Sequence, residues 1–93
     1  MSPVRAEMHY VYVLRDASNG KFYTGYTADL RKRMAEHDEK RTRYTSHRGP
    51  YELFYYEASR DSEDAKAREK YLKSGMGKRY LKNSAKRFLA LTG

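Results

Sequence analysis

Five side chains of the types that hydrolyse phosphate esters are spread along the chain. They are two tyrosines, an arginine, a histidine and a glutamate: Tyr12, Tyr23, Arg33, His37 and Glu69. Such a hydrolysis needs an activated water, a cation at the phosphate and stabilisation of the leaving oxygen. One carboxylate can hold Mg²⁺ if waters and a phosphate oxygen complete the octahedron, and an arginine adds fixed positive charge. A tyrosine beside a metal and an arginine can then serve as the general base.

Each of these residues also has a purely structural interpretation. Tyr12 and Tyr23 could be half-buried tyrosines of a sheet, and Arg33 could be a surface arginine. His37 could simply end a helix, where a polar ring suits the helix dipole. Glu69 could pair with a lysine four residues further along its helix. The residue types alone therefore do not decide between a catalytic and a structural role. The spacing of these residues along the chain has to decide it.

The elements that must position these side chains follow from hydrophobic periodicity and turn residues. Strands are predicted at residues 9–15, 21–26 and 51–58, and helices at residues 28–40, 62–73 and 78–91. The first two strands are joined by a tight turn at Asn19-Gly20, so they must be antiparallel. The order strand, strand, helix, strand, helix, helix (ββαβαα) predicts an α+β fold with a small three-stranded antiparallel sheet flanked by helices. With 93 residues we expect one domain, residues 1–93.

The helix ends are predicted from capping residues. Thr27 is the expected N-cap of the first helix, with Leu30 and Met34 facing inward. Asp61 or Ser62 is the expected cap of the second helix. Gly75 and Gly77 are expected to end that second helix.

Strand parity tests whether the two tyrosines can converge. A four-residue loop at the turn pairs Tyr12 with Gly25 and Leu14 with Tyr23, so the tyrosines become diagonal neighbours on one face. In that register Gly25 leaves open space beside Tyr12. A two-residue loop keeps both tyrosines on that face but places them two pairs apart. Arg33 and His37, four residues apart, share a face of the first helix.

Positive charge is concentrated in the last third of the chain. The net charge is +8, and residues 65–93 hold 9 lysines and arginines with one acid, whereas residues 1–64 hold 11 of each sign. A one-sided basic surface attracts a polyanion, most commonly nucleic acid. An anionic membrane surface and a solvated face without a partner are the alternatives. The residues expected to bind phosphates are Lys78, Arg79, Lys82, Lys86, Arg43 and Arg48.

The composition excludes several other classes. The chain has no cysteine, which removes disulfides and thiolate metal sites and is typical of a reducing cytosol. No apolar run reaches the roughly 18 residues of a membrane span. Residues 1–8 include Arg5 and Glu7 and lack the apolar block of a secretory signal. We therefore expect a cytoplasmic protein without a membrane partner.

The order of the candidate residues resembles a known family. Tyr10-Val11-Tyr12, and Tyr23-Thr24-Gly25 eleven residues after Tyr12, are similar to the paired motifs of GIY-YIG endonucleases. Arg33 and His37 follow at the family's spacing, and Glu69 lies in a later helix. The resemblance covers about residues 9–83 and is closest to small stand-alone bacterial members. In the first motif Tyr10 and Val11 replace the usual Gly and Ile, and in the second Thr24 replaces the Ile, while Tyr12, Tyr23 and Gly25 are kept.

The resemblance implies a metal-dependent endonuclease that acts in DNA repair or processing. It implies that Tyr12, Tyr23, Arg33 and His37 are catalytic and that Glu69 holds Mg²⁺ or Mn²⁺. Gly25 belongs to the second motif, and Asn83 lies on the third helix, where several members place an asparagine of the catalytic site. The expected substrate is DNA in preference to RNA.

Two other functions are compatible with the sequence. A non-catalytic binding module would grip phosphates with the basic third and stack bases on tyrosines. A subunit of a larger nuclease complex would depend on a protein partner for targeting. The binding module gives no special reason for Arg33 and Glu69 to match the motif, whereas an endonuclease does.

Overall fold

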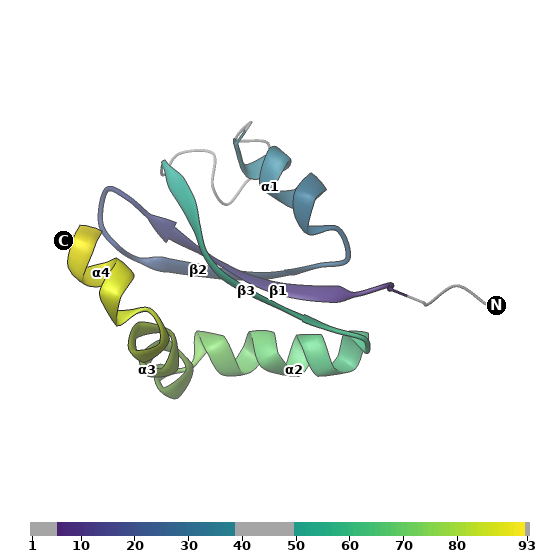
Figure 1. Ribbon diagram of the computed structural model, residues 1–93. Coiled ribbons are helices and arrows are strands. Elements are labelled where there is room, and N and C mark those ends of the chain that lie inside the picture. The colour runs from purple at the N-terminus through teal and green to yellow at the C-terminus, as the bar shows by residue number, and fades with distance from the viewer. Residues whose placement is uncertain (1–5, 39–49, 93) are drawn as a thin grey trace.

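Three strands form one antiparallel sheet with helices on both of its faces. The computed structural model describes residues 6–38 and 50–92. The elements are β1 (His9–Asp16), β2 (Phe22–Thr27), α1 (Leu30–Asp38), β3 (Tyr51–Ser59), α2 (Ser62–Lys73), α3 (Gly75–Ser84) and α4 (Lys86–Thr92). The strand order is β2-β1-β3, and Figure 1 shows α1 on one face of the sheet and α2 and α3 on the other. The predicted α+β fold with a three-stranded antiparallel sheet is confirmed.

The β1–β2 hairpin has the four-residue loop that the parity argument requires. The Asp16 N–H donates to the Lys21 carbonyl at 2.8 Å, and Gly20 has a φ of 74° in the intervening turn. That φ lies in the left-handed region that glycine adopts at little cost. Tyr12 consequently pairs with Gly25, and Leu14 pairs with Tyr23. Tyr12 and Tyr23 lie on one face of the sheet, as predicted.

The hydrophobic core lies between the sheet and the helices that cover its second face. Val11 and Val13 of β1 are almost fully buried against Ala65 and Leu72 of α2 and Leu81 of α3. Because side chains alternate along a strand, Tyr12 and Leu14 point to the opposite face, where α1 lies. Two faces of one strand thus serve two purposes, one for packing and one for the candidate site.

The first helix begins later than predicted and uses a different cap. α1 starts at Leu30, and Asp29 accepts a hydrogen bond from the Lys32 N–H at 3.1 Å. Thr27, the predicted cap, instead accepts from the Asp29 N–H at 3.1 Å and forms part of the turn that leads into the helix. Aspartate is as good a cap as threonine, so local geometry decides between them. The predicted helix end at residues 39–40 lies outside the described residues.

The predicted helix at residues 78–91 is two helices. α3 begins at Gly75, capped by Ser74, and the chain leaves helical geometry at Ala85 with φ −128° and ψ 34°. α4 then begins at Lys86. The change of direction brings the Phe88 ring to 5.7 Å from that of Phe54 in β3, a contact between two aromatic rings that favours the break.

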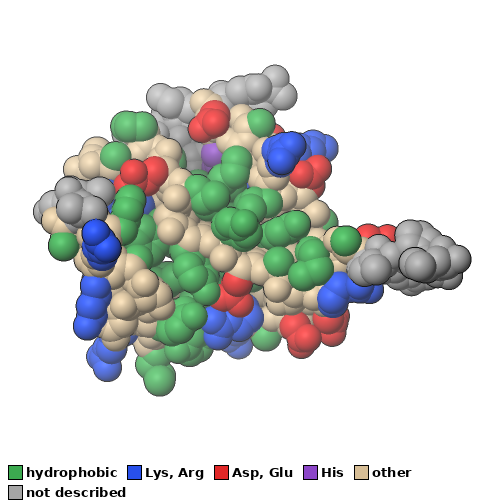
Figure 2. All heavy atoms as spheres, viewed as in Figure 1, with side chains coloured by type: hydrophobic (Ala, Val, Ile, Leu, Met, Phe, Trp, Pro, Cys, Tyr) green, Lys and Arg blue, Asp and Glu red, His purple; other side chains and the backbone are tan. Residues whose placement is uncertain are grey.

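Basic side chains lie at several places on the visible face, including the end where the C-terminus lies (Figure 2). Figure 2 shows lysines and arginines over α3 and α4, at the end where the C-terminus lies. Arg43 and Arg48, two of the expected phosphate-binding residues, lie outside the described residues. None of the helices in the described part of the chain has the length and apolar character needed to cross a membrane.

Candidate active site

An open groove of about 560 Å³ follows the edge strand β2 and is lined by four of the five residues expected to be catalytic or to hold the metal, His37 being the exception. Its lining residues are Tyr12, Phe22, Tyr23, Thr24, Gly25, Tyr26, Arg33, Glu69, Lys73 and Lys78. Strand β2 has a neighbour on one side only, so groups from α1 on one face and α2 on the other can both reach the groove around its edge. The groove therefore combines the face that carries the tyrosines with the helix that carries the candidate metal ligand.

The Tyr12 hydroxyl lies between a cation and an imidazole. The Arg33 Nε–H donates to it at 3.2 Å, and His37 Nε2 lies 3.1 Å from it. Tyr12 and His37 are 1% and 5% exposed, so water competes little for these contacts. Both α1 residues reach the tyrosine because they lie four residues apart on the helix face that packs on the sheet.

The charge state of His37 follows from its surroundings. Burial and the nearby positive charge of Arg33 lower the pKa of His37 below its ordinary value of 6.5. His37 is therefore a neutral imidazole at pH 7, and its Nε2 can accept the Tyr12 proton when the ring proton is on Nδ1. The hydrogen bond to Tyr12 raises the pKa of Arg33, which stays cationic.

Tyr23 lies on β2 beside the same histidine. Its ring centre is 5.8 Å from that of His37, with the rings near perpendicular at 72°. The Tyr12 ring meets the same imidazole at 5.7 Å and 65°. The structure thus brings Tyr12, Tyr23, Arg33 and His37 together, although they come from three different elements.

Gly25 is required by the position of the Tyr12 ring. A Cβ placed on Gly25 would collide with the ring and hydroxyl of Tyr12, because the ring lies across the glycine. The predicted open space beside Tyr12 is therefore wrong in detail, since the Tyr12 side chain itself fills it. An aromatic ring over a strand glycine in a neighbouring strand is a known way of packing such a position.

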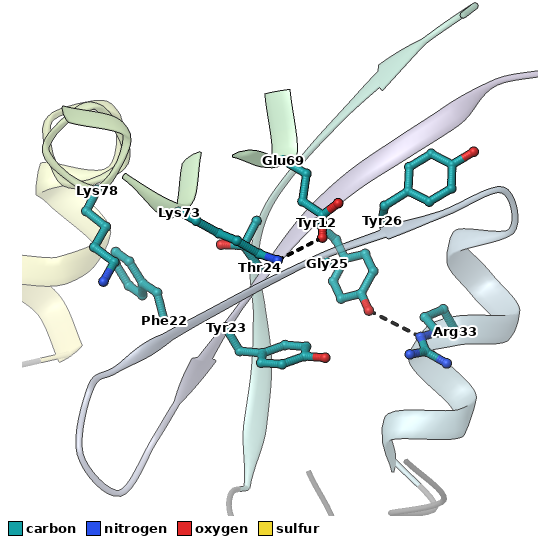
Figure 3. A pocket seen from close by; sticks show the side chains of 10 residues that line it. All are labelled: Tyr12, Phe22, Tyr23, Thr24, Gly25, Tyr26, Arg33, Glu69, Lys73 and Lys78. Atoms are coloured by element: carbon teal, nitrogen blue, oxygen red, sulfur yellow. Dashed lines mark hydrogen bonds and ion pairs between the residues drawn. The ribbon is translucent and has the colours of Figure 1, made fainter. Parts of the chain in front are cut away.

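Glu69 lies on the other side of the edge strand, in α2. Its carboxylate forms an ion pair with Lys73 Nζ at 3.1 Å, four residues along the helix, and its side chain is 24% exposed. Figure 3 shows Glu69 and Lys73 above β2, and the Tyr12–Arg33 hydrogen bond below it. The structural interpretation of Glu69 as a helix salt-bridge partner is thus correct, and it is compatible with a second role because the carboxylate faces the groove.

The donor set at Glu69 discriminates between metals. Within residues 6–38 and 50–92, no group of three or more histidine, cysteine or acidic side chains could hold a metal ion. That excludes a zinc site built from described residues, which would need at least three protein ligands. Mg²⁺ keeps several waters and binds through one or two carboxylates plus substrate phosphate. A partly exposed lone glutamate in an open groove fits such an ion.

The predicted phosphate-binding residues divide into two groups. Lys78 lines the main groove, and Lys82, one turn later on α3, lines a second groove that adjoins it. Arg79 and Lys86 are exposed but line neither groove. Asn83 is exposed on α3 and is not among the lining residues of either groove.

A model of the GIY-YIG catalytic domain matches residues 8–83. The chain belongs to the GIY-YIG family. The match includes both motifs and Glu69, and it assigns the chain to a family of nucleases.

Relatives of this GIY-YIG chain include small proteins named UPF0213. That of Bacillus pumilus is 44% identical over 62 residues, which are 66% of this chain and 62% of the relative. That of Clostridium perfringens is 39% identical over 67 residues, 71% of each protein. The solution structure of the UPF0213 protein BH0048 from Bacillus halodurans is 36% identical, with a TM-score of 0.51 over 80% of this chain and 81% of that one. The chain thus spans less than two thirds of the Bacillus pumilus relative.

Sequence reasoning missed several residues of the GIY-YIG groove. Tyr26, Thr24 and Phe22 point to the opposite face from Tyr23, yet they line the same groove because β2 is an edge strand. The Tyr26 hydroxyl is 2.8 Å from His9 Nδ1, so His9 helps to fix a groove side chain. The alternation of side chains along β2 predicts which residues share a face. It does not predict the strand order, and only the strand order shows that β2 lies at the edge of the sheet.

Proposed function

We propose that the groove along β2 hydrolyses phosphodiester bonds of nucleic acid with one Mg²⁺ or Mn²⁺, acting on DNA in preference to RNA. The observation that supports this most directly is the Tyr12 hydroxyl, held between cationic Arg33 and neutral His37 in a groove that also contains Glu69. A binding module needs no buried proton acceptor beside a tyrosine. A role in DNA repair or processing, a cytoplasmic location, a single domain and a partner that supplies targeting belong to the same proposal.

The chain's own residues divide the work. His37 accepts the Tyr12 proton at Nε2 as Tyr12 takes a proton from the attacking water, and Arg33 stabilises the tyrosine oxygen during the transfer. Arg33 also adds positive charge to the side of the groove where the phosphate lies. Tyr23 packs against His37 and holds the imidazole in orientation.

Glu69 is the residue that would hold the metal. When bound, the ion supplies Lewis acidity at the phosphate and stabilises the leaving oxygen. Lys73 now neutralises Glu69, and it can turn to a substrate phosphate when a cation replaces it, because its side chain is 56% exposed.

Replacing Glu69 separates cleavage from binding. Glu69→Gln keeps the size and helix propensity of the side chain, so the fold should persist. We expect the single-turnover cleavage rate to fall by at least about 10²-fold, with nucleic-acid binding unchanged or slightly tighter because a negative charge leaves a basic region. The measurement is a cleavage rate beside a binding isotherm on plasmid, branched DNA and structured RNA, with Mg²⁺, with Mn²⁺ and with chelator.

Two outcomes contradict the proposal in different ways. Wild-type cleavage by Glu69→Gln refutes the role of Glu69 as metal ligand. Normal binding without cleavage by the parent protein on every substrate favours the non-catalytic module, in which the groove only grips the phosphate backbone.

A further inference from the structure

Three adjoining grooves follow β2 from the hairpin turn to the start of α1. The main groove shares Phe22 and Lys78 with a groove at the hairpin end, and it shares Tyr26 and Arg33 with a groove at the α1 end. Figure 3 shows Phe22 and Lys78 together on one side of the site, with Arg33 on the other. One extended path for a strand of nucleic acid therefore passes the candidate site.

The two ends of this path differ in charge. Among its described lining residues, the hairpin-end groove contains three lysines and no acid: Lys21, Lys78 and Lys82. The α1-end groove contains Lys32 and Arg33 together with Asp29 and Glu36. These two basic and two acidic side chains balance in number, so the described residues give the α1-end groove no net positive charge.

Resting on the proposed function, we infer that the substrate strand is held asymmetrically. Its longer arm lies on the hairpin side of the scissile phosphate, where Lys21, Lys78 and Lys82 neutralise successive phosphates. The arm on the α1 side is held weakly, because the acids of that groove repel phosphate. The protein therefore needs an extended strand on one side of the cut and can cleave close to the strand end on the other.

The length of the held arm follows from strand geometry. Five residue steps lead from Gly20 at the turn to Gly25 at the site, and about 3.3 Å per strand residue gives about 17 Å. That distance corresponds to about five base-pair steps of a duplex whose axis runs along the groove, at 3.4 Å of axis each. An extended single strand needs fewer nucleotides to cover it.

The binding test compares two pairs of substitutions that remove the same charge. Lys78→Gln with Lys82→Gln alters residues of the grooves, whereas Arg79→Gln with Lys86→Gln alters exposed residues that line neither. Each lost phosphate contact should reduce the slope of log affinity against log salt by roughly 0.7–0.9. We expect the groove pair to lose roughly 1.5 and the control pair to lose little. Equal reductions of the salt slope in both pairs would contradict the proposed path of the strand through the grooves. This binding result does not depend on whether the protein cleaves the strand.

A second pair of variants tests the asymmetry itself by binding. Lys21→Gln lies at the hairpin end, and Lys32→Gln at the α1 end. We expect the salt slope to flatten with Lys21→Gln and to change much less with Lys32→Gln. An equal or larger effect of Lys32→Gln contradicts the asymmetry.

A cleavage assay then measures directly which side of the cut needs the longer strand. End-labelled strands are shortened from one end at a time while the cut position is mapped. We expect cleavage to stop when the strand is shortened to within about five nucleotides of the cut on one side, and to persist much closer on the other. Equal length requirements on both sides overturn the inference. Absence of all cleavage instead rejects the proposed hydrolysis, and the two binding tests still decide where the strand lies.

Discussion

The Tyr12 hydroxyl has a cationic donor on one side and a proton acceptor on the other, and that arrangement depends on three residues from two elements. Arg33 and His37 are fixed to each other by the turn of α1, and Tyr12 is fixed by the Gly25 register of the hairpin. His37 can accept a proton only because burial and Arg33 keep it neutral. Arg33 thus helps to keep His37 neutral, and the hydrogen bond to Tyr12 helps to keep Arg33 cationic.

Replacing Tyr12 with phenylalanine tests this dependence. Tyr12→Phe keeps the ring over Gly25 and removes the hydroxyl. We expect the single-turnover cleavage rate to fall by about 10²–10⁴-fold, the usual contribution of a positioned acid or base. Stability should fall by about 1–3 kcal/mol, since His37 and Arg33 lose a partner in a buried place.

Tyr23→Phe is the matched comparison. It retains the ring contact with His37, so we expect a much smaller loss of rate. Single-turnover kinetics and urea unfolding of both variants provide the measurement. A larger loss for Tyr23→Phe than for Tyr12→Phe would move the proton transfer to Tyr23.

At this scale much of the site could be predicted from the sequence. Parity and the turn predicted that Tyr12 and Tyr23 share a face, and helix spacing predicted that Arg33 and His37 do. The ring of Tyr12 over Gly25 could not be predicted, because it depends on a side-chain rotamer. The sequence predicted Lys73 only as a salt-bridge partner of Glu69. Its place in the lining of the groove could not be predicted, because spacing does not say which face of α2 packs on the sheet.

Among the elements, the junction of α2 and α3 controls where Lys78 and Lys82 lie relative to Glu69. Gly77 of α3 packs directly on the end of α2, and a Cβ at this position would collide with the backbone of Tyr71 and Leu72. Ser74 links the helices by accepting a hydrogen bond from the Gly77 N–H at 3.1 Å. The close approach fixes the direction of α3 and hence of its lysines.

A methyl group at Gly77 should disturb that junction. We expect Gly77→Ala to lower the free energy of unfolding by about 1–3 kcal/mol, because backbone cannot move aside as a side chain can. Gly75→Ala is the control: nothing lies within 4 Å of its Cβ position, and alanine favours helix by up to about 1 kcal/mol. The measurement is urea unfolding of both variants. Equal free energies of unfolding would show that α2 and α3 can move apart at Gly77 without loss of stability.

The elements show where sequence patterns stop being informative. Hydrophobic spacing predicted a continuous helix at residues 78–91, because Leu81, Ala85 and Leu89 keep helical periodicity across the break. The break at Ala85 accompanies the contact of Phe88 with Phe54, a residue far away in the sequence, which helical periodicity cannot reveal. The choice of Asp29 rather than Thr27 as cap depends equally on how the chain leaves β2.

For the molecule as a whole, two titrating groups make the fold sensitive to acid in the same direction. Burial lowers the pKa of His37, so its stabilising neutral form is complete above its ordinary pKa and is lost as pH falls. The hydrogen bond from Arg68 lowers the pKa of Glu57, so this stabilisation is also lost as pH falls. The two losses begin at different pH values, below about 6.5 for the histidine and below about 4.5 for the carboxylate.

We therefore expect the urea midpoint to decline in two stages on acidification. The first stage begins below about pH 6.5 and comes from His37. His37→Gln removes this titration, so the variant should be less stable at neutral pH but should lack the first stage. A first stage of unchanged size in His37→Gln would assign the acid sensitivity to another group.

The assembly of the site around an edge strand has a consequence for the cell. The tyrosines, Arg33 and His37 come early in the chain, and Glu69 comes late, so a ribosome-bound chain exposes an incomplete site until α2 has packed on the sheet. A folded chain whose α1 opens locally loses Arg33 and His37 while Glu69 remains in place. Under the proposed hydrolysis, only the fully folded chain can cleave nucleic acid, so any process that removes incompletely folded chains does not remove active nuclease.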